Sequence, residues 1–220
     1  ISCSLVGSEM CIRDRQYHPY AKIEERGFWE GLDPELKQHL LDMGTTFLGF
    51  GWKGIPATYY LEFFRSGDRT CYEDAAFKKR LALGSLVLAE CVQNEGVFLN
   101  DIINGIWSLC EESSWAASAH LQHSVKTNDV LPDALEDVIL DLFALETAQL
   151  LAFTYYLLKD KLDAVSVQIA KRIQGELYRR VCSPYLQELQ FWWMGFMNPD
   201  VNNWAPWCIS NILYTFTLAC

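Results

Sequence analysis

The feature that most constrains the fold is a helical spacing of apolar residues that continues along most of the chain. One stripe recurs at intervals of three and four residues, and its members are Phe77, Leu81, Ser85, Leu88 and Val92. No alternating run bounded by a hairpin dipeptide, the usual signature of a strand, accompanies it. The pattern predicts an all-α protein with long helical segments at residues 57–65, 72–93, 98–112, 132–159 and 163–182.

The segments between these helices are short and polar. A brief helix is expected from Asp33 and Pro34, because aspartate caps a helix and proline suits its first turn. A stretch with three glycines, at residues 49–54, then interrupts the helical pattern and lacks the residue order of a phosphate-binding loop. Successive helices joined in this way, without a tight repeat, predict an array of antiparallel helical hairpins.

Charge and apolar content exclude two classes of partner. The 220 residues carry 28 acidic and 18 basic side chains, a formal net charge of −10, which disfavours nonspecific binding to nucleic acid or to an anionic membrane. The most apolar run, residues 150–158, is about half of the ~20 residues that a membrane-spanning helix requires. We therefore expect neither a nucleic-acid nor a membrane partner.

Tryptophan is the most unusual component, with eight residues, which predicts either a thick helical core or a ligand groove. The cysteines beyond residue 15 form no paired or regular motif, so the sequence indicates no metal or redox site. Unpaired cysteines favour a reducing, cytoplasmic compartment. A periplasmic or secreted location stays open, because the true N-terminus is expected upstream.

The first fifteen residues, ISCSLVGSEMCIRDR, have neither a helical period nor the apolar core of a secretory signal. Residues 5–14 resemble a translated sequencing adapter, so we interpret residues 1–15 as an assembly scar and 16–220 as the domain; the alternative is an unusual genuine leader. The chain also stops at Cys220 within an apolar run. It is therefore interpreted as a fragment of a longer reading frame.

The densest group of candidate functional residues lies near the C-terminus. A polar turn, residues 198–203, follows Trp192 and Trp193 and precedes Trp204 and Trp207. Tryptophan faces stack on sugar rings, and asparagine amides bind hydroxyl or carboxylate oxygens, so the group has the composition of a saccharide-binding groove. The alternative is that Asn203 caps the following helix and the tryptophans fill the core.

A second group combines carboxylates and histidines. Glu111 and Glu112 precede His120 and His123, and Asp137 and Asp141 follow. Paired carboxylates are suited to acid and base catalysis, although solvated helix faces also explain them. The two histidines lack an evident third ligand, so a metal is not expected.

The order of these pieces resembles the heparinase II/III-like polysaccharide lyases. The resemblance covers nearly all of residues 16–220 and is carried by four stretches, namely FLNDIINGIW at 98–107, the stretch from EESSW at 111–115 to Ala119 and His120, DLFALETA at 141–148, and NNW at 202–204. It implies the helical N-terminal domain of that family, the first part of an (α/α) toroid. It also implies β-elimination on a polysaccharide that contains uronic acid, without an obligatory metal or cofactor.

Position by position, the resemblance makes Asn203 the carboxylate-binding, catalytic asparagine, with Asn202 as the fallback. Trp204, Trp207, Trp115 and His120 are then expected to shape the substrate cleft. Asn203 is followed by Trp204, as in toroid lyases that act on chondroitin or hyaluronan, whereas many alginate and heparin lyases have histidine there. The resemblance leaves the polysaccharide open.

The remaining parts of such a lyase are expected beyond Cys220. They are the catalytic Tyr and His, the last toroid helices, a β-sandwich domain and the basic residues that would attract an acidic substrate. Tyr214 is too close in sequence to Asn203 to serve as that tyrosine, so the fragment by itself is expected to be inactive. Two alternatives stay open: a glycoside hydrolase on the same type of toroid that acts through a carboxylate such as Asp200, and a non-catalytic helical scaffold.

Overall fold

The computed structural model describes residues 18–123, 129–132, 139–187, 191–195 and 202–219, and the described residues contain helices and no strand. This confirms the all-α prediction. The helices are α2 (Arg26–Glu30), α3 (Pro34–Thr46), α4 (Ala57–Ser66), α5 (Thr70–Gln93), α6 (Leu99–Cys110), the 3₁₀ helix η2 (Ser118–His123), α7 (Leu142–Val165), α8 (Val167–Leu177), the π-helical turn η3 (Tyr178–Cys182), α9 (Ser183–Gln187), the 3₁₀ helix η4 (Trp192–Met194) and α10 (Trp204–Ala219). The expected leader, residues 1–15, lies outside the described residues.

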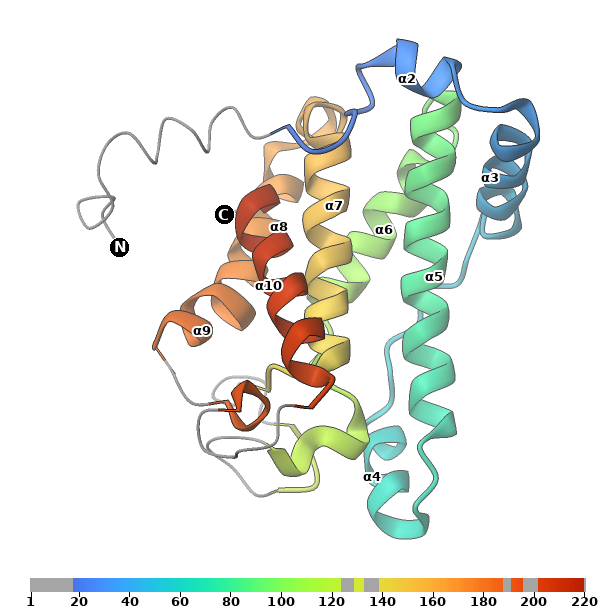
Figure 1. Ribbon diagram of the computed structural model, residues 1–220. Coiled ribbons are helices and arrows are strands. Elements are labelled where there is room, and N and C mark those ends of the chain that lie inside the picture. Colours follow the sequence, from blue (N-terminus) through green and yellow to red (C-terminus); the bar gives the residue numbers. More distant parts are fainter. Residues whose placement is uncertain (1–17, 124–128, 133–138, 188–190, 196–201, 220) are drawn as a thin grey trace, which may run out of the picture.

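Three long helices, α5, α7 and α10, run in the same direction (Figure 1). Phe77 and Phe143 meet near the start of α5 and α7, and Glu90 pairs with Lys161 near their ends. Tyr20 contacts both Phe153 of α7 and Tyr214 of α10, with ring centroids 5.2 and 6.4 Å apart, respectively. The N-terminal ends of these helices therefore lie at the same end of the molecule, the lower end in Figure 1.

The helices α6 and α8 run in the opposite direction and lie beside one another behind this row (Figure 1). The turn between α5 and α6 is held by the buried Glu90, which accepts hydrogen bonds from the backbone N–H groups of Gly96 and Phe98. Between α7 and α8 a single residue, Ser166, reverses the chain, and its hydroxyl accepts a hydrogen bond from the N–H of Gln168. Two layers result, parallel within each layer and antiparallel between layers.

The predicted stripe of α5 is only partly buried, since Ser85 and Val92 are buried but Phe77, Leu81 and Leu88 are exposed. Leu81 is 54% exposed and Phe77 is exposed as well, whereas Lys79 is only 3% exposed. The face that packs inward contains Tyr72, Ala76, Leu83 and Leu86. The packing of α3, α6 and α7 against α5 determines which apolar residues of this helix are covered.

Three predicted helix boundaries were wrong. The helix expected at 132–159 begins at Leu142, because the Asp141 carboxylate caps it by accepting a hydrogen bond from the Ala144 N–H at 2.7 Å. It continues past Lys159 to Val165, so the next helix begins at Val167 rather than at 163. The helices expected at 57–65, 72–93 and 98–112 are confirmed to within two residues at each end.

The described cysteines are all free, and four of the five are buried. Burial raises the pKa of Cys91, Cys110 and Cys208 to about 12, so these thiols remain protonated and pack as small apolar groups. Among the described residues no helix is both long and apolar enough to cross a bilayer.

Candidate functional site

The candidate site lies at the lower end of the helix rows, where η2, η4 and the first residues of α7 and α10 come together (Figure 1). Its residues come from four separate stretches of sequence, at 118–123, 141–143, 192–194 and 202–204. We call this region the helix-end site. It contains several of the residues predicted to bind substrate.

Asp141 holds the helix-end site together. Its side chain is buried, and one oxygen accepts the Ala144 N–H that caps α7. The other oxygen accepts a hydrogen bond from the Ala117 N–H at 3.0 Å and lies 2.7 Å from Nδ1 of His120. Because a carboxylate oxygen can only accept, Nδ1 of His120 donates in this pair, and the orientation of the imidazole is set. The expectation that Asp141 lies on a solvated helix face is wrong.

His120 lies within a cluster of aromatic rings. Its imidazole is stacked on Phe143, with centroids 5.5 Å apart and planes 9° apart. The ring of Trp204 meets it edge-on at 4.7 Å, and Trp192 lies 4.6 Å from Trp204. These rings connect the starts of α7 and α10, and we call them the aromatic wall: His120, Phe143, Trp192 and Trp204.

The two asparagines of the polar turn have different surroundings. The Asn202 side chain accepts a hydrogen bond from the Trp204 N–H at 2.9 Å at the start of α10. Asn203 is exposed. The capping role that the scaffold alternative assigned to Asn203 therefore belongs to Asn202. Asp200, Asp137 and the side chain of His123 lie outside the described residues.

The tryptophans divide between surface and core. Trp207 is 49% exposed, whereas Trp193 is buried and donates a hydrogen bond to the Leu140 carbonyl. Trp115, which was expected at the cleft, lies in the core with 3% of its surface exposed. Its indole N–H donates to the Leu109 carbonyl at 2.8 Å, and the guanidinium of Arg180 lies 4.6 Å from the ring centroid.

A small cavity of about 240 Å³ adjoins the aromatic wall, between α5 and α7. Phe143, Arg80 and Glu146 line it together with Phe77, Thr147 and Leu150. Partial burial raises the pKa of Glu146, and a hydrogen bond from Trp207 opposes that rise. The cavity thus places a cation and a carboxylate beside the helix-end site.

Arg80 belongs to a buried charge cluster that sequence analysis missed. Glu112, which was expected on a solvated helix face, is buried and receives Lys79 at 2.7 Å and Arg80 at 2.6 Å. Burial would lower the pKa of Arg80, but the neighbouring Glu112 carboxylate outweighs it and raises that pKa, so the guanidinium stays charged. Two cations against one carboxylate leave the cluster with a net positive charge. No sequence signal identifies it, because Glu112 is 33 residues from Lys79.

Within the part of the chain that the structure describes, no group of three or more His, Cys, Asp or Glu side chains is arranged to hold a metal ion. Comparison with known proteins gives no assignment, since no protein-family profile and no curated protein matches the chain.

Proposed function

We propose that the chain is part of a polysaccharide lyase that cleaves uronic-acid-containing polysaccharide by β-elimination, and that its helices form the first part of an (α/α) toroid. The two helical layers, parallel within a layer and antiparallel between layers, support the toroid part of the proposal. A ring of helical hairpins requires this alternation, since each hairpin adds one helix to each layer.

The observation that carries the function is the meeting of distant stretches at the helix-end site. His120, Asp141 and Trp204 come from three of the stretches that carry the resemblance, and the structure brings them within hydrogen-bond or ring contact. Residues separated by up to 84 positions would not need to meet if the resemblance were accidental. Asn203 immediately precedes Trp204 and is exposed beside the same wall.

The chemistry of the helix-end site suits an anionic sugar. The Asn203 amide would donate to the uronate carboxylate and stabilise the charge that develops there when a base removes the C5 proton. The C4–O bond then breaks, a C4–C5 double bond forms, and the leaving oxygen takes a proton. The N-terminal ends of α7 and α10 and the charged Arg80 favour an anion at this end of the molecule. The resemblance implies a Tyr and a His as the base and the acid.

The scaffold alternative predicts that Trp204 and Trp207 are fully buried. Trp207 is half exposed and Asn203 is exposed, so these residues are accessible to a ligand. Trp204 is partly buried, with one side against His120. These placements favour a binding surface over a purely structural role.

Titration of the chain with a tetrasaccharide of galacturonate, followed by calorimetry, tests the proposal. We expect Asn203→Ala to weaken binding by about tenfold, the equivalent of one charge-assisted hydrogen bond. Asn100→Ala, which removes an exposed asparagine from α6, is the matched control and should bind normally. Equal affinities for the wild type and Asn203→Ala would exclude Asn203 from the site.

The reaction itself is tested on the longer reading frame. A lyase releases unsaturated uronates that absorb in the near ultraviolet, whereas a hydrolase releases saturated products. Initial rates should fall as salt is added, because screening weakens attraction between a basic cleft and an acidic substrate. Release of saturated products alone would replace the lyase by the hydrolase alternative.

A further inference from the structure

A further cavity lies apart from the helix-end site. It has a volume of about 910 Å³ and is formed by the segment before α4, by α6 and by the start of α8. We call it the outer cleft. It shares no lining residue with the small cavity between α5 and α7, and its size is within the range of small-ligand sites, about 300–1,000 Å³.

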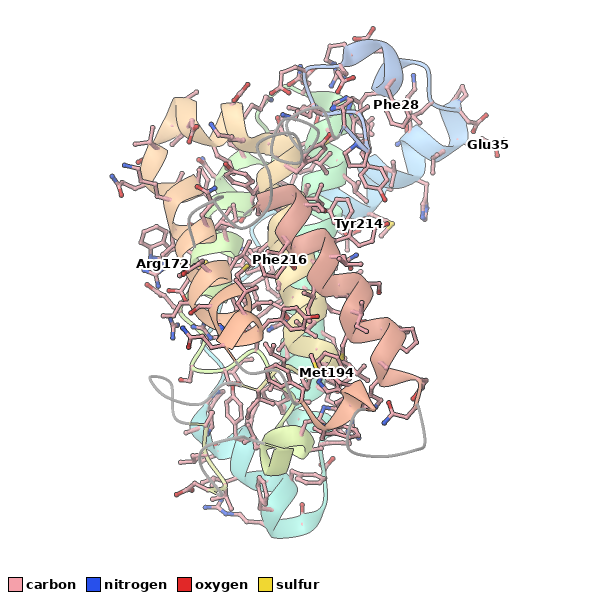
Figure 2. All side chains as sticks on the ribbon, turned by 60° about the vertical axis from the view of Figure 1, so that its left-hand side comes forward. Phe28, Glu35, Arg172, Met194, Tyr214 and Phe216 are labelled. Carbon is pink, nitrogen blue, oxygen red and sulfur yellow. The ribbon has the colours of Figure 1, made fainter. Side chains whose placement is uncertain are left out.

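Aromatic rings form walls of the outer cleft. Trp107 of α6 is 41% exposed, and the guanidinium of Arg172 lies 5.3 Å from its ring centroid. Figure 2 shows Arg172 projecting from the outer side of α8, away from α10. The Arg172 guanidinium lies over the Trp107 ring and limits the movement of this side chain, which reduces the entropy lost when a ligand stacks on Trp107.

Trp52 is positioned by a close approach to α6. A Cβ at Gly105 would lie 2.6 Å from Cη2 of Trp52, so only glycine lets the indole lie directly against the helix. Phe50 meets Trp52 edge-on, with ring centroids 4.7 Å apart. The indole N–H of Trp52 is buried and has no hydrogen-bond partner within the described residues. A buried donor without a partner is uncommon and is a reason to expect a ligand or a water nearby.

The polar groups of the outer cleft are neutral or acidic. Asn104 and Ser113 are exposed in it and can both donate and accept hydrogen bonds. Glu111 contributes a negative charge, whereas Glu112 is paired with both Lys79 and Arg80 in the buried cluster of net positive charge. No lysine or arginine is among the residues that line this cavity. The Glu111 carboxylate disfavours an acidic sugar beside it, and the Arg172 guanidinium is occupied with the Trp107 ring.

We propose that the outer cleft is a second saccharide-binding site, specific for uncharged oligosaccharides, with sugar rings stacked on Trp107 and Trp52 and hydroxyl groups bonded to Asn104, Ser113 and Glu111. Tryptophan faces and neutral hydrogen-bonding groups are the combination that recognises a pyranose. This goes beyond the proposed lyase activity and does not depend on it, because the two sites share no residue and differ in their preferred charge.

The test uses ¹⁵N-labelled chain and the indole N–H signals of its tryptophans. Cellotetraose and maltotetraose are the uncharged probes, and tetragalacturonate is the acidic one. At least one uncharged probe should shift the Trp52 and Trp107 signals, assigned from Trp52→Phe and Trp107→Phe, while tetragalacturonate leaves them in place. Trp107→Ala should weaken that binding by about tenfold or more, as expected for loss of a central aromatic contact.

Three substitutions test which residues determine binding in the outer cleft. Gly105→Ala displaces the Trp52 ring and should weaken uncharged-probe binding, whereas Asn203→Ala should leave it unchanged. Glu111→Gln removes the repelling charge and should allow tetragalacturonate to shift the Trp107 signal. The proposal is overturned if neither uncharged probe shifts these signals at millimolar concentration, or if tetragalacturonate binds the wild-type outer cleft equally well. Failure of galacturonate binding at Asn203 would contradict the lyase proposal alone.

Discussion

Replacement of Asp141 tests whether the helix-end site depends on one buried carboxylate. In Asp141→Ala, the cap of α7 is lost, which costs about 1 kcal/mol. The buried Ala117 N–H also loses its acceptor, which costs about 1–3 kcal/mol, and the partly buried His120 ring loses one at a cost of about 1 kcal/mol, the lower end of that range. The expected loss is therefore about 3–5 kcal/mol, a large share of the ~5–15 kcal/mol that stabilises a typical domain.

Urea unfolding followed by far-ultraviolet circular dichroism measures this loss. The matched control is Asp33→Ala, because Asp33 caps α3 from an exposed position and accepts hydrogen bonds only from the backbone N–H groups of Glu35 and Leu36. That variant should lose about 1 kcal/mol. If Asp141→Ala is no less stable than Asp33→Ala, the hydrogen bonds of Asp141 with Ala117 and His120 contribute nothing to stability, and the reasoning fails.

Three other predictions concern packing, protonation and thiol reactivity. Gly44→Ala should destabilise the chain by about 1–3 kcal/mol in the same unfolding assay, because a Cβ at position 44 would lie 2.3 Å from the Cβ of Ala89. A urea midpoint equal to that of the wild type would contradict this contact. Burial raises the pKa of Glu146 above its ordinary value of 4.5, so the stabilising contribution of this side chain is present below pH 4.5 and is lost as the pH rises through the raised pKa. Glu146→Gln should therefore gain stability relative to the wild type between pH 4 and pH 7, and a constant difference in stability would refute the shift. Iodoacetamide labelling with peptide mapping should modify the exposed Cys71 and spare Cys91, because burial raises the pKa of Cys91 to about 12. Equal labelling of the two cysteines in the native chain would show that α5 is not packed as described.

The helical content of the chain was predictable from local pattern. The segments that became α4, α5 and α6 begin and end within two residues of the predicted boundaries, because a helical period and flanking turn residues are properties of neighbouring positions. The start of α7 was missed for a physical reason. The apolar spacing extends back to Ile139, but the cap on Asp141 and the contacts of its carboxylate with Ala117 and His120 favour an extended backbone there.

Local pattern determined that the chain is helical and where most helices lie, since periodicity and capping act over a few residues. Which face of α5 is buried, and whether a charged residue is inside, depended on elements distant in sequence. Lys79 is buried because Glu112 neutralises it, and Leu81 is exposed because no described helix packs over it. The helix-end site and the outer cleft also depend on tertiary structure. Each is formed by residues from separate helices, and the contacts among these residues exist only after the helices have packed.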